Sequence, residues 1–135
     1  TTYGARQRSE VYNMANFKSA VLTTGTYTGS STSQVELIGP VNVKNEDRLS
    51  FQFINNDTTG TNTDVIQVWG RLATTSGTLA DAGEWTQIGD NIVVSGSTSS
   101  LKAISTTGLY WCGVTINPDA THASLSHDWA MLRQA

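Results

Sequence analysis

The feature that most constrains the fold of this chain is a series of short segments in which apolar and polar residues alternate. The segment from Arg48 to Asn55 shows it most clearly, because Leu49, Phe51 and Phe53 alternate with polar neighbours. In a β-strand such alternation places the apolar side chains on one face and the polar side chains on the other. We therefore expect a half-buried strand here, with one face in a core and one in solvent.

Similar segments recur from residue 19 onward. Besides 48–55, the expected strands span residues 20–24, 34–38, 64–72, 84–88, 91–94, 101–104, 109–116 and 125–132. Turn residues separate them, as in Gly25–Ser33 and at the pair Gly39-Pro40. About nine short strands at such intervals are typical of a sandwich or barrel. We expect an all-β fold, an antiparallel, jelly-roll-like β-sandwich of about 8–9 short strands.

Composition supports this class and excludes others. Ser and Thr occupy 34 of the 135 positions, whereas only 14% of the residues are charged. Thr favours strands and Ser favours turns, while Glu and Lys, which build helix surfaces, are sparse, so a helical bundle is excluded. A single cysteine cannot form an internal disulfide or a zinc site with two or four cysteine ligands. No apolar run approaches the roughly 18 residues of a membrane span, so we expect neither a membrane partner nor an export signal.

Charge divides the chain into a basic leader and an acidic body. Residues 1–18 have a balance of +2 within a total of −3, so the remainder is acidic, which argues against nucleic acid as a partner. In the leader, Val11, Met14 and Phe17 recur every three residues, as in one or two helical turns. We expect an extended or partly helical N-terminal arm at 1–18 and one sandwich domain at 19–135. The arm either frays as a free terminus or docks on a neighbouring subunit.

The tryptophans carry a further prediction. Residues expected on the inward faces of two strands are Ile66, Val68 and Leu72, and Tyr110, Cys112, Val114 and Ile116. Parity then turns Trp69, Arg71 and Trp111 outward. An outward aromatic surface is covered by another chain or is open to a ligand. In a third reading it is buried within the fold, because a helix, a loop or the arm covers it or because both faces of the sheet are buried, and all three readings stay open. We expect Trp85 and Trp129 to be core anchors.

Signals of catalysis or metal binding are weak. The sequence holds no nucleophile elbow, P-loop, dinucleotide-binding glycine motif or zincin motif. His122 and His127 are five residues apart, an odd offset that would turn two strand side chains to opposite faces. We predict a loop histidine and a strand histidine with a local partner such as Asp119 or Asp128. Cys112 is expected to be a buried, unreactive thiol. We expect no enzymatic activity, no cofactor and no metal.

The stretch from Asn55 to Asp64, NNDTTGTNTD, contains no apolar side chain. It resembles the beginning of a calcium loop, with oxygen ligands at alternate positions. The carboxylate that should close such a loop is missing, because Ile66 stands in its place. We predict a flexible polar surface loop.

The order of segments between Val65 and Ile116 carries a resemblance. The strand V-I-Q-V-W-G-R-L is followed by a loop and then by E-W-T-Q-I-G, N-I-V-V-S-G, S-L-K-A-I and G-L-Y-W-C-G-V-T-I. This order resembles that of small β-sandwich proteins from the structural gene clusters of tailed bacteriophages. The chain departs from them at Cys112-Gly113, where such sequences often carry an arginine, so a role tied to that arginine does not transfer. The resemblance implies a virion component, foremost a capsid decoration (cement) protein, with a head-fibre base or tail adaptor as near relatives.

We therefore expect a virion structural protein that binds the assembled lattice of major capsid protein from outside. Such a protein would be made in the host cytoplasm, would stabilise the shell by mass action, and as a homotrimer would gain avidity. The expected contact residues are Tyr3, Arg6, Arg8, Tyr12, Phe17, Trp69, Arg71 and Trp111. The alternative is a carbohydrate-binding or adhesion module, in which Trp69 and Trp111 stack on a glycan.

Overall fold

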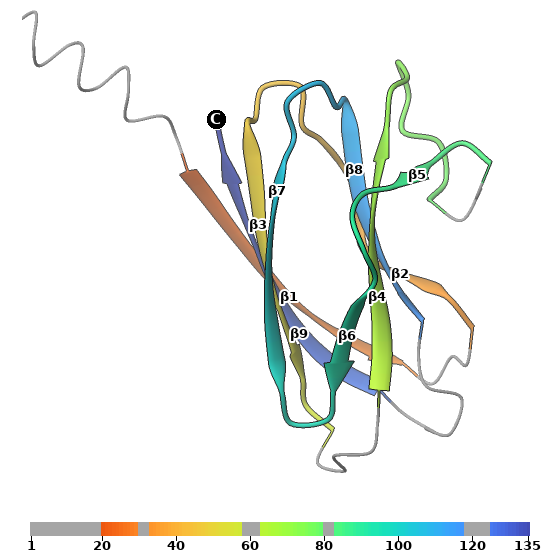
Figure 1. Ribbon diagram of the computed structural model, residues 1–135, viewed down its shortest axis with the longest axis vertical. Coiled ribbons are helices and arrows are strands. Elements are labelled where there is room, and N and C mark those ends of the chain that lie inside the picture. Colours follow the sequence, from red (N-terminus) through yellow and green to blue (C-terminus); the bar gives the residue numbers. More distant parts are fainter. Residues whose placement is uncertain (1–19, 30–32, 58–62, 80–82, 118–124) are drawn as a thin grey trace, which may run out of the picture.

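The computed structural model describes residues 20–29, 33–57, 63–79, 83–117 and 125–135. Within these ranges the chain forms nine strands and no helix, and the strands build two antiparallel sheets that face each other (Figure 1). The strands are β1 (Ala20–Gly29), β2 (Val35–Asn42), β3 (Arg48–Asn55), β4 (Thr63–Arg71), β5 (Thr86–Gln87), β6 (Ile92–Ser95), β7 (Ser99–Ser105), β8 (Trp111–Asn117) and β9 (Leu125–Gln134). The described residues include no helix that is long and apolar enough to cross a membrane.

The strand order is that of a jelly roll. Sheet A has the order β1-β9-β3-β7, and sheet B has the order β2-β8-β4-β5 with β6 also paired to β4. The first four strands alternate between the two sheets, and the last strand returns to lie beside the first. This double-sheet arrangement confirms the predicted all-β, jelly-roll-like sandwich. The predicted arm at 1–18 lies outside the described residues.

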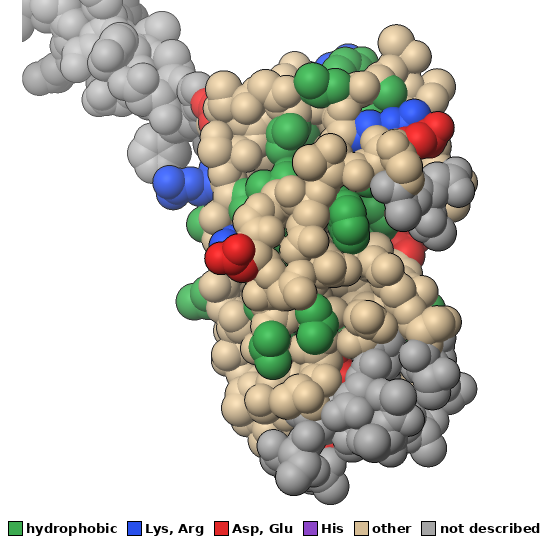
Figure 2. Space-filling view, turned by 45° about the vertical axis from the view of Figure 1, so that its right-hand side comes forward, with side chains coloured by type: hydrophobic (Ala, Val, Ile, Leu, Met, Phe, Trp, Pro, Cys, Tyr) green, Lys and Arg blue, Asp and Glu red, His purple; other side chains and the backbone are tan. Residues whose placement is uncertain are grey.

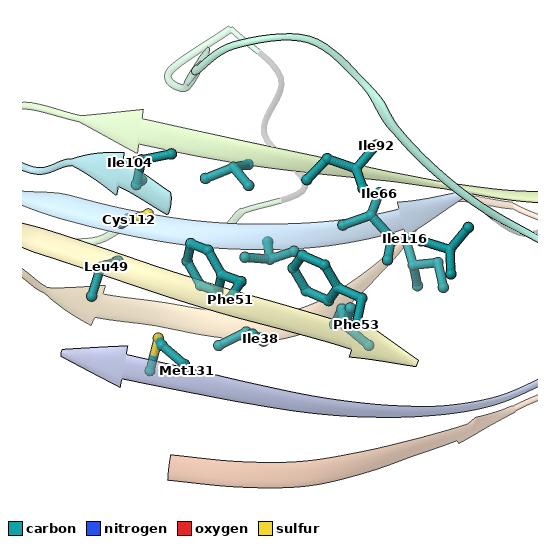
Figure 3. Packing of buried hydrophobic residues seen from close by; sticks show 14 of the residues in the cluster. Ile38, Leu49, Phe51, Phe53, Ile66, Ile92, Ile104, Cys112, Ile116 and Met131 are labelled. Atoms are coloured by element: carbon teal, nitrogen blue, oxygen red, sulfur yellow. The ribbon is translucent and has the colours of Figure 1, made fainter. Parts of the chain in front are cut away.

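The core lies between the two sheets and is built by the alternation seen in the sequence. Leu49, Phe51 and Phe53 of β3 are at most 1% exposed, and the two phenyl rings stack with centroids 5.7 Å apart. Ile66 and Ile116 of sheet B point toward them across the gap (Figure 3). The predicted inward face of β3 is thus confirmed.

Two strands run longer than their turn residues predict, and both lie at sheet edges. β1 continues through Gly25, where an added Cβ would lie 2.5 Å from the indole of Trp129, so glycine is needed for this ring to pack. β2 continues through Gly39 and Pro40 with two shifts of register against β8. An edge strand tolerates proline because its outward N–H groups have no ladder partner to lose.

One inward prediction fails at the end of β4. The strand ends at Arg71, so Leu72 does not continue the alternation and is 72% exposed. The alternation itself holds for Ile66 and Val68, which are at most 1% exposed.

Candidate functional site

Residues 72–79 and 83–85, which follow β4 and form the covering segment, lie over the outer face of sheet B. The Arg71 guanidinium anchors it, because Nη1 donates a hydrogen bond to the Ser76 carbonyl oxygen at 2.6 Å and lies 3.1 Å from Oε2 of Glu84. Leu79 lies against Gly113 of β8, where a Cβ would meet the leucine methyl at 3.0 Å. Gly113 therefore leaves room for Leu79 on the outside of the sheet.

A cavity of about 330 Å³ lies beneath this segment. Its lining comes from β2 and the residue before it, from the middle of β4 and β8, and from the covering segment: Gln34, Val35, Glu36, Trp69, Thr78, Leu79, Trp85 and Thr115. Ligand pockets in proteins span roughly 300–1,000 Å³ and combine apolar walls with a few polar groups. This cavity has both the size and the mixed lining of a small-ligand site.

Hydrogen bonds hold the polar side of the cavity in place. Trp69 Nε1 donates to Thr115 Oγ1 at 2.8 Å, and Gln34 Nε2 donates to the same oxygen at 2.7 Å. Thr115 is only 4% exposed, so its hydroxyl is a fixed point on the outer face of sheet B. The arrangement sets the plane of the Trp69 indole against that face.

A chain of amides continues from the cavity across sheet B. Gln34 Nε2 donates to Gln67 Oε1 at 3.2 Å, and Gln67 Nε2 donates to Gln87 Oε1 at 3.2 Å and to Asn91 Oδ1 at 3.0 Å. Gln87 Nε2 also donates to Asn91 at 2.7 Å. These uncharged side chains fix one another, so this part of the outer face of sheet B is held by amide hydrogen bonds and not by ion pairs.

The structure turns Trp69, Arg71 and Trp111 away from the core, as parity predicts, but it does not leave them as one open platform. All three are half-buried. Trp69 lines the cavity, whereas Trp111 Nε1 donates to the Ala73 carbonyl oxygen at 3.1 Å and is held by the covering segment. Of the three readings, cover by a loop describes Trp111. The other predicted contact residues, Tyr3, Arg6, Arg8, Tyr12 and Phe17, lie outside the described residues.

The prediction that Trp85 anchors the core between the sheets is wrong, because this side chain is buried elsewhere. Trp85 is buried, at 5% exposure, but it lies on the outside of sheet B, where it lines the cavity and its Nε1 donates to the Thr78 carbonyl oxygen at 3.2 Å. It is therefore buried against the outer face of sheet B and not between the two sheets. Trp129, by contrast, packs against the core between the sheets.

A buried polar cluster at one end of the sandwich joins side chains of three strands and reaches the backbone of a fourth, β6. His127 Nε2 of β9 lies 2.7 Å from Oδ2 of Asp64 at the start of β4, and both residues are 0% exposed. Asn55 at the end of β3 donates to the same carboxylate at 3.2 Å and to the Val94 carbonyl oxygen at 3.1 Å. His127 Nδ1 is buried without a hydrogen-bond partner among the described residues.

This cluster corrects two predictions. The partner of His127 is not a local aspartate but Asp64, which precedes it by 63 residues. The polar stretch from Asn55 to Asp64 is not surface loop at its two ends, since both end residues are buried in the cluster. Among the described residues no group of three His, Cys, Asp or Glu side chains could hold a metal ion. His122 and Asp119 lie outside the described residues.

Cys112 of β8 points into the core, as predicted. It is 0% exposed, and desolvation raises the pKa of its thiol to about 12. A thiol with such a pKa is protonated at neutral pH, and the protonated form is a poor nucleophile.

Comparisons with known proteins give similarity of fold. No family model matches the chain, and no curated protein matches it in sequence. Among solved structures, PirA is 14% identical over 83% of this chain and 93% of its own, with a TM-score of 0.50. A chain from the disulfide-linked pili of Bacillus endospore appendages is 13% identical over 87% and 89%, with a TM-score of 0.48. The coat protein of Tobacco streak virus is 7% identical over 86% of each chain, with a TM-score of 0.38. At these identities the likeness concerns the fold alone.

Proposed function

We propose that this protein is a structural component of a virion, a capsid decoration protein that binds the assembled head shell and stabilises it. The proposal rests on one observation above all, an uncharged patch on the outer face of sheet A. Cross-strand pairs define its first row as Leu22, Leu132, Ser50 and Ala103, and its second row as Thr24, Ala130, Gln52 and Leu101. The row beyond, toward β9's start, contains Asp128, and Arg48 lies at the other end of β3.

The patch exposes apolar side chains that the fold itself does not need. Leu22 is 64% exposed on β1 and Leu101 is 78% exposed on β7, the two edge strands of sheet A. Interface centres are depleted in charged residues, and contiguous apolar surface mostly marks a contact with another protein. An uncharged sheet face with exposed leucines fits a contact with another protein surface, such as that of a shell lattice.

The face of the molecule that Figure 2 shows fits a binding role better than a catalytic one. On the face drawn in Figure 2, hydrophobic side chains form small separate groups among uncharged polar side chains and backbone, and charged side chains are scattered. The His127–Asp64 pair resembles part of a catalytic triad, but both side chains are enclosed and out of reach of a substrate. We also propose that the chain is not an enzyme. In addition, we propose that the basic leader at 1–18, opposite in charge to the acidic body, makes a second contact with the shell.

Two variants and one control test the proposal in a sedimentation assay with assembled shells of the phage that encodes the chain. Leu22→Asp combined with Leu101→Asp should abolish binding, because each carboxylate would be desolvated at the contact. Leu72→Asp, at a leucine of similar exposure outside the patch, should leave binding unchanged. Deletion of residues 1–18 should also abolish binding while near-ultraviolet circular dichroism shows an intact sandwich. Full binding by the double aspartate variant and by the deletion variant would refute the proposal.

A further inference from the structure

The cavity on the outer face of sheet B is not used by shell binding through sheet A. We propose that it binds a single terminal sugar residue of a neutral glycan, with Trp69 and Trp85 as stacking walls and Thr115 and Gln34 as hydrogen-bonding groups. This activity goes beyond the proposed function, because it uses the opposite sheet and a ligand of a different chemical class.

The first support is the pair of indoles. Trp69 comes from the middle of β4 and Trp85 from the covering segment, and both line the same cavity. The nitrogen of each is already engaged, with Thr115 Oγ1 and with the Thr78 carbonyl oxygen. The indoles therefore offer ring surface and no free donor. Flat aromatic surface suits the apolar C–H face of a pyranose ring.

The second support is the remaining hydrogen-bond donor of the Thr115 hydroxyl. Its oxygen accepts hydrogen bonds from Trp69 and from Gln34, which occupies both lone pairs of a hydroxyl. The hydroxyl proton remains, and among the described residues it makes no hydrogen bond. Because Thr115 is 4% exposed and lines the cavity, this proton is a donor held ready for a ligand oxygen.

The remaining polar groups of the cavity are chiefly acceptors. Both amide protons of Gln34 are used by Thr115 and Gln67, so its Oε1 is left to accept. Glu36 adds a carboxylate to the same lining. A ligand must therefore bring several donors and at least one acceptor, which is the pattern of adjacent sugar hydroxyls. The carboxylate also disfavours an acidic sugar.

Two aromatic rings beside a carboxylate can also form a cage for a quaternary ammonium ion. Here the Arg71 guanidinium already lies over the Trp85 ring, with Cζ 6.0 Å from its centroid. A second cation at this ring would be repelled by the first, so the cavity favours a neutral ligand. Its volume of about 330 Å³, at the low end for ligand pockets, matches one sugar ring better than a long chain.

The test uses the full chain and methyl glycosides of glucose, galactose, mannose and N-acetylglucosamine as probes, with choline as the cationic competitor. Saturation-transfer-difference NMR detects binding, and a titration gives the dissociation constant. Thr115→Val and Gln34→Ala each remove one polar group, and Gln34 is exposed, so its replacement leaves the fold intact. Thr86→Val on β5 and Gln134→Ala on β9 are matched controls, since they make the same kinds of change outside the cavity lining and outside the hydrogen bonds that hold it.

We expect at least one glycoside to bind, with a dissociation constant that rises about tenfold or more in Thr115→Val and Gln34→Ala, the equivalent of one lost hydrogen bond of about 1.4 kcal/mol. The two controls should bind as the wild type does. Three outcomes would overturn the inference: no binding of any glycoside, binding that persists unchanged in both cavity variants, or binding of choline in preference to every sugar. None of them bears on shell binding, which is measured separately.

Discussion

The imidazole of His127 lies 2.7 Å from the carboxylate of Asp64, and the protein encloses both side chains completely. The two residues come from different sheets, since β9 belongs to sheet A and β4 to sheet B. Together with Asn55 they form a polar tie between the sheets at one end of an otherwise apolar core.

Loss of the Asp64 carboxylate should lower the free energy of unfolding strongly, although only one side chain is removed. Asp64→Ala leaves His127 and Asn55 buried without their shared acceptor, and we expect the free energy of unfolding to fall by about 3 kcal/mol. Urea denaturation followed by fluorescence measures the change. Asp90→Ala, at an exposed turn residue, is the control and should have little effect. Equal stability of both variants would show that the pair contributes nothing to the fold.

Gly25 is expected to be irreplaceable because of Trp129. In Gly25→Ala the new Cβ would lie 2.5 Å from the indole, closer than atoms can approach, so the ring must move. Overpacking of this kind costs about 1–3 kcal/mol, which calorimetry would record as a lower Tm. Gly83→Ala is the matched control, because nothing lies within 4 Å of a Cβ there. A stable Gly25→Ala variant would contradict the packing described for Trp129.

The Cys112 thiol should be unreactive in the native protein. Burial raises its pKa to about 12, so at about pH 8 it holds its proton and lies out of reach of a thiol reagent. Labelling should be negligible in buffer and complete in guanidinium chloride. Rapid labelling of the native protein would show that the strand carrying it opens readily.

The same pKa shift predicts a loss of stability in alkali. The native chain keeps the thiol proton at pH values where the unfolded chain, with a thiol pKa of 9.0, loses it. This contribution to stability is present below pH 9.0 and is lost as the pH rises toward about 12. Comparison with Cys112→Ala over this range isolates the effect, since the variant lacks the titrating group. Parallel pH profiles of the two proteins would contradict it.

Asp128 gives a milder prediction at the acidic end. Thr26 Oγ1 donates to its carboxylate at 2.8 Å, and this hydrogen bond is the largest cause of a lowered pKa for Asp128. Thr26→Val should move that pKa up toward the value of a free aspartate, and Thr28→Val should not. The stabilising effect is present at neutral pH and is lost as the pH falls through the lowered pKa. NMR titration of the carboxylate carbon measures both variants.

Local periodicity predicts much of this fold and little of its site. Alternation in β3 and β4 is enough to place Phe51, Phe53, Ile66 and Val68 in the core, because burial of one strand face is a property of the segment itself. It cannot reveal that Gly25 continues a strand, since the reason is an indole more than one hundred residues later in the chain.

The cavity and the buried cluster depend on contacts between distant segments. Parity turns Trp69 outward, but only the path of the covering segment decides that Trp85 joins it and Trp111 does not. Asp64 reads as part of a polar loop, because nothing near it in sequence indicates a buried histidine as its partner. One local signal is the apolar Trp85 between the polar residues Glu84 and Thr86, and it indicates burial without saying on which side of the sheet.

The most direct test of the proposed function is a sedimentation assay that compares assembled head shells with unassembled capsid protein at equal mass. A decoration protein recognises a surface that exists only in the lattice, so the wild-type chain should comigrate with shells to saturation and should not bind free subunits. It should also raise the temperature at which the shells disassemble, because a ligand stabilises the state to which it binds. Absence of comigration, or equal binding to free subunits, would contradict the account.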